Sequence, residues 1–322
     1  MPQLPKRALG KTDLQVTPIG LGMMEFSGGG SGMLGGAFPV IDQGEKNATV
    51  KAGLDGGVNW FDTAELYGGG VSEAALAAGL KAAGVSDKDV IVCTKWWPLF
   101  RTAANIPQTI DDRLRFLGGY SIGLYMIHQP FGFSSAEAEM DAMAGLVKAG
   151  KIHAVGISNF SADQMRRAHK ELQKFGLPLA VNQVRYSLLD RSIERNGILD
   201  TAKELGVTIV AYTPLGSGLL TGKYHKNPEL LAKKAWFWRA RMRGGIEKTR
   251  TLVAALEEIA AGYKVSAAQV ALNWVITARG DGVVTIPGVT KVSQAVESAA
   301  AMQFQLSAAE ITRLDDLSAK IQ

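Results

Sequence analysis

Four residues that could together handle a proton stand at the ends of three apolar runs of the sequence. Asp62, Lys95 and His128 each close such a run, and Tyr67 lies just beyond Asp62. Each residue alone has a structural explanation, such as a helix cap or a packed core side chain. A carboxylate, an ammonium, an imidazole and a phenol at matching positions instead predict a site for acid–base chemistry, because a buried lysine or aspartate needs a partner.

The phenol of Tyr67 is the expected proton donor. A tyrosine pKa is near ~10, and a donor that works near neutrality needs it lowered by about three units, or roughly 4 kcal/mol. An ammonium at ~4 Å contributes about that much at an effective dielectric constant of about 20. We therefore expect Lys95 to lower the pKa of Tyr67, while Asp62 keeps Lys95 charged. His128 is expected to hydrogen-bond the substrate oxygen or to steer the proton.

The elements that must position these groups follow from the alternation of short apolar runs with amphipathic stretches. This alternation predicts an α/β fold, namely a (β/α)8 TIM barrel with long loops at its C-terminal face, where barrel enzymes carry out their chemistry. An open, doubly wound sheet is the alternative architecture. The eight runs cover residues 19–23, 58–63, 90–94, 121–128, 152–158, 179–184, 207–212 and 283–286.

Further local signals complete this segmentation. Residues 7–9 and 14–16 flank residues 10–13, a pattern that predicts an N-terminal β-hairpin over the bottom of the barrel. Residues 218–245 are too long for a simple connection and predict either a functional lid or a mobile insertion. Capping boxes predict three helix starts, at Ser161 with Gln164, Ser266 with Gln269, and Ser307 with Glu310.

A glycine-rich stretch after the first run matches the dinucleotide-binding spacing G-x-G-x-x-G through Gly30, Gly32 and Gly35. In that motif the glycines open a helix whose N-terminus meets the pyrophosphate. Here Pro39 and a stretch without helical period follow, and the next helix is expected near Glu45. We interpret the match as false and the stretch as a flexible loop at the barrel mouth.

Composition excludes several classes of protein. The chain has 322 residues, of which 47% are hydrophobic and 20% charged, as in an ordinary globular enzyme. Its net charge of +5 is scattered rather than gathered in one long run, so no nucleic-acid partner is predicted. Cys93 is the only cysteine, and neither a signal peptide nor a membrane span is evident, so a soluble, cytoplasmic protein is expected. One basic cluster is either a solvated loop or a site for an anionic cofactor or partner: Arg239, Arg241, Arg243, Lys248 and Arg250.

Motifs along nearly the whole chain resemble the aldo-keto reductase family. They are NWFDTAELYG from Asn59, CTKW from Cys93, LYMIHQP from Leu124, KIHAVGISNF from Lys151, VNQVRYSLL from Val181, AYTPLGSGLLTGKY from Ala211 and IPGVTK from Ile286. The resemblance implies one domain over residues 1–322, in which the four residues singled out above form the catalytic tetrad of a carbonyl-reducing oxidoreductase. It also implies that a nicotinamide delivers hydride to the carbonyl carbon while Tyr67 protonates the oxygen.

The resemblance further implies an NADPH site without a Rossmann fold. Ser158, Asn159 and Gln183 would hold the carboxamide, and Tyr212 would stack on the nicotinamide ring. The other implied contacts are Gly22 and Met23, then Thr213, Leu215, Gly218, Leu220 and Lys223 along the pyrophosphate, and Gly288, Lys291, Gln294, Glu297 and Ser298 around the adenosine phosphate. Gln294 and Ser298 depart from the Arg and Asn of many relatives, whereas Lys291 offers a cation for a 2′-phosphate and favours NADPH over NADH.

Two other functions are compatible with such a barrel. Members of the family also serve as cofactor-sensing accessory subunits of ion channels, which would need a partner surface. Metal-dependent hydrolysis is disfavoured, and no metal site is predicted, because the four histidines include no closely spaced pair. The expected partner is a small carbonyl substrate. Its pocket could be lined by Trp96, Trp97, Phe26, Tyr186 and residues 236–238, each of which could equally be a core residue. The oligomeric state does not follow from the sequence.

Overall fold

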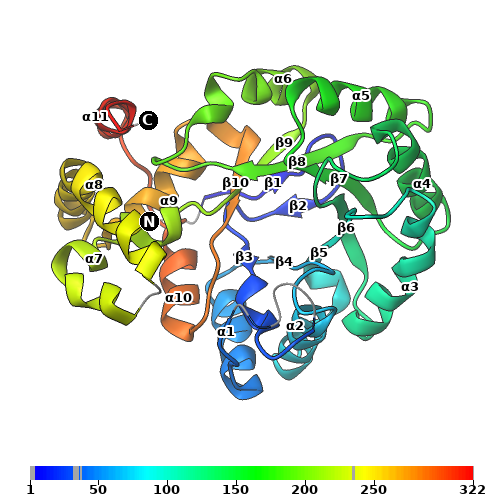
Figure 1. Cartoon of the computed structure of the whole chain (residues 1–322), viewed down its shortest axis with the longest axis horizontal. Coiled ribbons are helices and arrows are strands. Elements are labelled where there is room, and N and C mark those ends of the chain that lie inside the picture. Colours follow the sequence, from blue (N-terminus) through cyan, green and yellow to red (C-terminus); the bar gives the residue numbers. More distant parts are fainter. Residues whose placement is uncertain (1–3, 32–35, 37, 234–235, 322) are drawn as a thin grey trace.

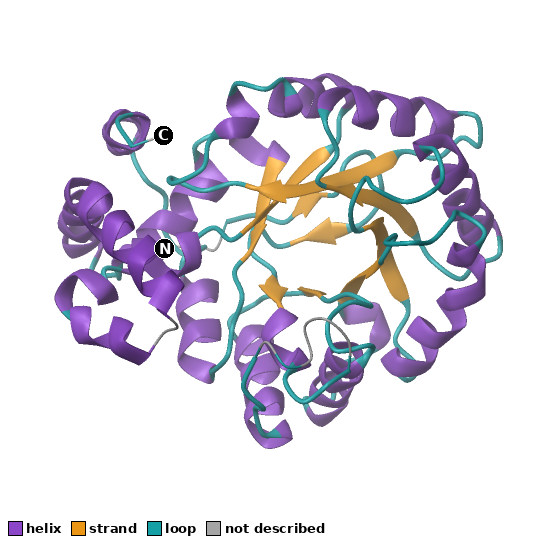
Figure 2. Ribbon diagram, in the orientation of Figure 1, coloured by secondary structure: helices purple, strands orange, loops and turns teal. Residues whose placement is uncertain are grey.

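Eight parallel strands form a nearly closed barrel with helices on its outside (Figures 1 and 2). The computed structural model describes residues 4–31, 36, 38–233 and 236–321, and the side chains of all of these except 231–243. The strands pair in chain order, and parallel bridges from Ile19 to Thr285 and from Gly22 to Gly288 join the first to the last. The strands are β3 (Leu21–Gly22), β4 (Trp60–Asp62), β5 (Ile91–Trp96), β6 (Ile122–Ile127), β7 (Ala154–Ser158), β8 (Leu179–Arg185), β9 (Thr208–Tyr212) and β10 (Val283–Ile286). The predicted barrel is confirmed, and each predicted run overlaps one strand; β5 and β8 extend past the predicted ends, to Trp96 and Arg185.

The outer ring consists of the helices that follow the strands. They are α1 (Gln43–Asp55), α2 (Val71–Ala82), α3 (Asn105–Leu117), α4 (Ala136–Lys148), α5 (Ala162–Gln173), α6 (Ile198–Leu205), α9 (Ala267–Thr277) and α10 (Val292–Ala300). The capping boxes at Ser161, Ser266 and Ser307 are all present, at the starts of α5, α9 and α11 (Ala308–Ala319). No helix in the described part of the chain is long and apolar enough to span a membrane.

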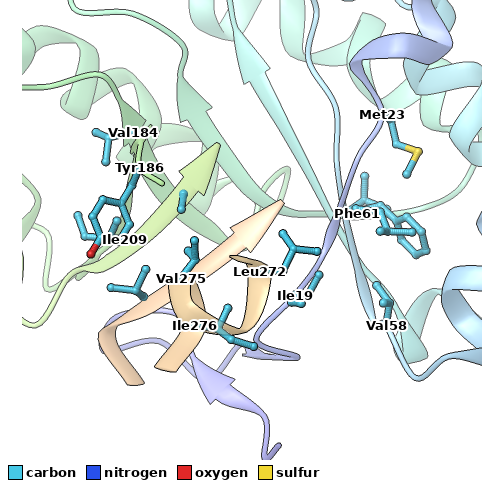
Figure 3. Close-up of a cluster of buried hydrophobic side chains, with 14 of the residues drawn as sticks. Ile19, Met23, Val58, Phe61, Val184, Tyr186, Ile209, Leu272, Val275 and Ile276 are labelled. Atoms are coloured by element: carbon cyan, nitrogen blue, oxygen red, sulfur yellow. The ribbon is translucent and has the colours of Figure 1, made fainter. Parts of the chain in front are cut away.

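The predicted hairpin also forms, as β1 (Arg7–Ala8) paired with β2 (Gln15–Val16). Its side chains Leu9 and Val16 join the apolar cluster inside the barrel, together with Trp60 from β4. The hairpin therefore closes the N-terminal end of the barrel and leaves the C-terminal end as the open face. A larger apolar core fills the space between strands and helices, as Figure 3 shows for Phe61, Ile209 and their neighbours.

The described part of the segment after β9 is mostly helical. It contains the 3-10 helices Gly216–Thr221 and Pro228–Lys233, α7 (Lys223–Lys226) and the start of α8 (Trp236–Tyr263), which packs against α9 and α11. The basic cluster therefore lies on helix α8, so its interpretation as a loop is wrong. Arg250 pairs with Glu247 at 2.9 Å, whereas the side chains of Arg239, Arg241 and Arg243 lie outside the described residues.

Candidate active site

The topology of the barrel brings the four predicted site residues together at its open end. Asp62 is the last residue of β4, Lys95 lies near the end of β5, and His128 directly follows β6. These three strands are neighbours in the sheet, so their C-terminal ends share one stretch of the rim. Tyr67 lies in the loop between β4 and α2, and its ring returns to the same point.

A buried ion pair forms the base of the site. Lys95 donates from Nζ to Asp62 Oδ1 at 2.5 Å and to the Thr63 carbonyl oxygen at 2.9 Å. The second carboxylate oxygen of Asp62 accepts a hydrogen bond of 2.9 Å from Gln183 Nε2 on β8. The side chains of Lys95 and Asp62 are 0% and 2% exposed. Each buried charge thus has several partners, which is the condition under which an ion pair persists in a protein interior.

The surroundings keep Lys95 positively charged. Burial by itself lowers the pKa of Lys95, but the charge of Asp62 and the hydrogen bond to its carboxylate oppose this effect, and the net direction is upward. Burial raises the pKa of Asp62, and the ammonium of Lys95 and the amide of Gln183 oppose that rise. An ammonium opposite a carboxylate is the arrangement that these opposing effects favour.

Tyr67 lies beside this ion pair, with its ring centroid 5.0 Å from Lys95 Nζ. The expected net lowering of its pKa is wrong. Burial raises the pKa of Tyr67, and the charge of Lys95 only partly offsets the rise. The reason is that Tyr67 is only 8% exposed. Burial removes the water that would stabilise a phenolate, and this loss exceeds the stabilisation that the charge of Lys95 provides. The hydroxyl is therefore held in its protonated form.

The imidazole of His128 completes the group. Its ring meets Tyr67 edge to face at a centroid distance of 5.7 Å and meets Trp97 in the same manner at 5.2 Å. Burial and the charge of Lys95 hold the pKa of His128 well below 6.5. The imidazole is therefore neutral and presents one N–H donor and one acceptor nitrogen. Its Nδ1 atom is buried without a hydrogen-bond partner among the described residues.

A second polar group lies on the next strands of the rim. Ser158 at the end of β7 donates from Oγ to the carbonyl oxygen of Gln183 at 2.9 Å. Asn159 adopts a φ of 64° and donates from Nδ2 to the His128 carbonyl oxygen at 3.3 Å, while its Oδ1 accepts from the Tyr212 hydroxyl at 2.9 Å. Left-handed backbone at a residue other than glycine carries strain and is concentrated at functional sites. Ser158, Asn159, Gln183 and Tyr212 are thus linked by hydrogen bonds, and Gln183 connects them to Asp62 at the base of the site.

The loop after β9 contains several left-handed residues. Thr213, Ser217 and Gly218 have φ values of 55°, 56° and 90°, and the N–H groups of Gly216 and Gly218 bond the carbonyl oxygens of Thr213 and Leu215. A Cβ placed on Gly218 would lie 3.3 Å from Lys223 Nζ, which brings a cation to the same turn. Leu215 precedes the turn and is partly buried, whereas the side chain of Leu220 is wholly within the core.

The seam between β3 and β10 holds the remaining predicted contacts. Gly22 pairs with Gly288, Met23 is buried behind it, and Lys291 is exposed directly before α10. The side chain of Gln294 accepts from Thr290, and that of Glu297 accepts from Ser266, so both are engaged within the protein, and Ser298 is buried. Among the described residues after Gly30, the first helix is α1, which starts at Gln43; Gly32 and Gly35 lie outside the described residues.

The aromatic residues proposed for the substrate pocket divide into two kinds. Trp96, Phe26 and Tyr186 are fully buried core residues, and Figure 3 shows Tyr186 packed beside Val184. Trp97 alone among the described ones reaches the site, at His128. The side chains of residues 236–238 lie outside the described residues.

One acidic residue of this mouth escaped the sequence analysis. Glu25, in the short helix after β3, has a solvent-shielded Oε2 atom without a partner, and burial raises its pKa to about 7. Its charge contributes to the raised pKa of Tyr67. The available signal was an acidic side chain between two apolar residues, directly after the first barrel strand.

Comparison with known proteins identifies the family. A sequence model described as the Aldo/keto reductase family matches residues 18–319. The aldo-keto reductase str7 of Strobilurus tenacellus is 33% identical over 98% of this chain and 92% of its own length. The aldo-keto reductase yakc of Schizosaccharomyces pombe, whose name specifies NADP(+), is 30% identical over 97% of this chain and 90% of its own length. The crystal structure of a thermostable aldo-keto reductase, Tm1743, shares 28% identity and a TM-score of 0.77, covering 97% of this chain and 99% of that one. The chain belongs to the aldo/keto reductase family of oxidoreductases.

Proposed function

We propose that this chain, as a single domain, reduces aldehydes or ketones to alcohols with NADPH and uses Tyr67 as the proton donor. The observation that carries the proposal is the buried ammonium of Lys95, which is paired with Asp62 and lies 5.0 Å from the Tyr67 ring centroid. A fixed positive charge in a water-poor site stabilises negative charge that develops next to it during reaction. Here that charge is the phenolate left when Tyr67 gives up its proton.

The four residues divide the work of protonation. Tyr67 transfers its hydroxyl proton to the carbonyl oxygen, and Lys95 stabilises the phenolate that remains. His128, kept neutral by burial, donates a hydrogen bond to the same oxygen and orients it. The raised pKa of Tyr67 keeps the donor loaded before reaction, and Lys95 lowers the cost of its release. NADPH, when bound, supplies the hydride that the carbonyl carbon accepts, so the product is the alcohol.

The residues around the mouth fit a dinucleotide. The left-handed turn at Thr213, Ser217 and Gly218 with Lys223 beside it suits a pyrophosphate, and Tyr212 offers a ring for stacking. Ser158, Asn159 and Gln183 would bind the carboxamide. Lys291, exposed before α10, would pair with a 2′-phosphate and favour NADPH over NADH. The NADP(+) in the name of the yeast relative supports the same cofactor.

The channel-subunit alternative gains no support from these observations, since the relatives described above are named as reductases. The proposal is tested by replacing Tyr67 with Phe and following nicotinamide absorbance with a panel of carbonyl compounds. We expect turnover to fall about 10²- to 10⁴-fold, with NADPH affinity nearly unchanged. Tyr120→Phe is the matched control, because that hydroxyl bonds the Val85 carbonyl at the opposite end of the barrel. A fully active Tyr67→Phe protein would refute the proton donor.

A further inference from the structure

The loop that carries Tyr67 has little backbone restraint of its own. Three glycines follow the tyrosine, Gly68, Gly69 and Gly70, and their φ values are 75°, 65° and 107°. Glycine adopts left-handed backbone at no steric cost, but it also loses more conformational freedom on folding than any other residue. Contacts with other parts of the chain must therefore fix the phenol relative to the ammonium of Lys95.

Ser72, in the first turn of α2, makes such contacts with both ends of this loop. Its hydroxyl accepts from Thr63 Oγ1 at 2.8 Å, and its backbone N–H donates to the carbonyl oxygen of Tyr67 at 3.2 Å. The same hydroxyl donates to the carbonyl oxygen of Met23 at 2.6 Å. Ser72 and Thr63 are both fully buried, where hydrogen bonds are stronger than in water. One side chain thus closes the loop over residues 63–72 and ties it to the end of β3.

The contacts of Ser72 lead directly to the ion pair. Thr63 follows Asp62 in the chain, and its carbonyl oxygen accepts from Lys95 Nζ at 2.9 Å. Thr63 is therefore held at two points, by Ser72 through its side chain and by Lys95 through its carbonyl oxygen. A displacement of Thr63 would move the ammonium relative to the phenol of Tyr67.

The start of α2 is itself anchored, which makes Ser72 a fixed point. Glu73, the next residue, accepts from Thr94 Oγ1 on β5 at 2.6 Å and pairs with Arg113 on α3 at 3.0 Å. The side chains of Glu73 and Arg113 are 0% and 5% exposed. Because Thr94 directly precedes Lys95, the first turn of α2 contacts the strand that carries the ammonium as well as the loop that carries the phenol.

We propose that Ser72 is a positioning residue of the active site, whose hydroxyl fixes the Tyr67 phenol relative to the Lys95 ammonium. This inference rests on the proposed function. Ser72 acts through Thr63 and through the loop, and it does not contact the reacting atoms. Proton transfer depends steeply on the position of the donor, since a displacement of about 1 Å can cost about 100-fold in rate.

The test measures reduction by the full chain with NADPH and the carbonyl compound of the panel that the native chain reduces fastest. In Ser72→Ala, kcat should fall about 3- to 30-fold, while KM for the carbonyl compound and the dissociation constant of NADPH change less than about 2-fold. Thr63→Val breaks the same hydrogen bond from its other side, keeps the size of the side chain, and should lower kcat to a similar extent. The double variant should be at most about 2-fold slower than the slower single variant, because both substitutions remove one bond.

Two comparisons separate positioning from general stability. Adding Ser72→Ala to Tyr67→Phe should change the residual rate less than about 2-fold, because the donor that Ser72 positions is already absent. The matched control is Ser318→Ala, since Ser318 is also fully buried and its hydroxyl donates to the Leu188 carbonyl oxygen at 2.6 Å. It should lower the midpoint of urea unfolding as Ser72→Ala does and leave kcat unchanged.

Three results would overturn the inference: an unchanged kcat in either Ser72→Ala or Thr63→Val when folded, the full loss of Ser72→Ala recurring in the Tyr67→Phe background, or an equal loss of kcat in Ser318→Ala. Circular dichroism establishes that each variant is folded, and Thr63→Val decides the question if Ser72→Ala does not fold. A Tyr67→Phe protein with native turnover would instead contradict the proposed function, so the two failures are distinguishable.

Discussion

The carboxylate of Glu25 occupies the space that a side chain at position 288 would need: a Cβ built on Gly288 would lie 2.6 Å from Glu25 Oε1. The two residues belong to the first and last units of the barrel, so an acid is held at the seam where the barrel closes. Its other oxygen, Oε2, has no hydrogen-bond partner among the described residues and is shielded from solvent. Ionising such a group destabilises the folded state, but not the unfolded chain, in which water surrounds the carboxylate.

Replacing Glu25 with Gln should therefore stabilise the protein at alkaline pH. Burial raises the pKa of Glu25 from 4.5 to about 7, so the folded state holds its proton more tightly than the unfolded chain. Native stability then decreases as pH rises between about 4.5 and 7, and the variant escapes this decrease. The gain at pH 8 relative to pH 4 should be up to about 3 kcal/mol. Urea unfolding of both proteins at the two pH values measures it, and a gain that is the same at both would contradict the assignment.

Removing the counter-charge of Lys95 should destabilise the fold and abolish catalysis together. Asp62→Asn leaves a buried ammonium opposed only by neutral groups, and breaking a buried pair costs about 3–5 kcal/mol. Asp55→Asn provides the control, since it breaks the Lys51–Asp55 pair, which is 60% and 62% exposed, and should cost less than about 1 kcal/mol. Thermal and urea unfolding report the stabilities. Similar values for the two variants would show that the ion pair is not the base of the site.

The pH profile of carbonyl reduction should show no inflection at the ordinary pKa of a histidine or at that of a tyrosine. His128, with its lowered pKa, stays neutral from about pH 6 to about 9, and Tyr67, with its raised pKa, stays protonated over the same range. The one inflection expected is a decline near pH 7, because ionised Glu25 makes Tyr67 a weaker acid. Measuring kcat/KM against pH in the native chain and in Glu25→Gln tests this. A decline that persists in the variant would assign it to another group.

Lys291 should distinguish the two nicotinamide cofactors. We expect Lys291→Ala to raise the KM for NADPH about 3- to 10-fold and to leave that for NADH unchanged, since only NADPH carries the 2′-phosphate that the ammonium would pair with. Lys88→Ala is the matched control, because Lys88 is an exposed lysine before β5 at the opposite end of the barrel. Parallel changes for both cofactors would place Lys291 outside the phosphate site.

Local patterns in the sequence were sufficient to predict the strands and helix starts of the barrel and the convergence of the site residues at its mouth. Apolar runs bounded by polar residues located every strand, and each Ser followed by Gln or Glu located a helix start, because both signals depend on neighbours in the chain. Once the order of parallel strands is known, the ends of β4, β5 and β6 must be adjacent. The convergence of Asp62, Lys95 and His128 follows from that order.

The tertiary structure decided the properties that depend on residues far apart in the sequence, namely the burial of a side chain and the direction of its pKa shift. Trp96 and Trp97 are adjacent and chemically identical, yet one is core and the other contacts His128, because successive side chains leave a strand on opposite sides. The direction of the Tyr67 pKa was mispredicted for the same kind of reason. A single charge can be assigned from the sequence, but dehydration by burial arises from all the surrounding elements at once.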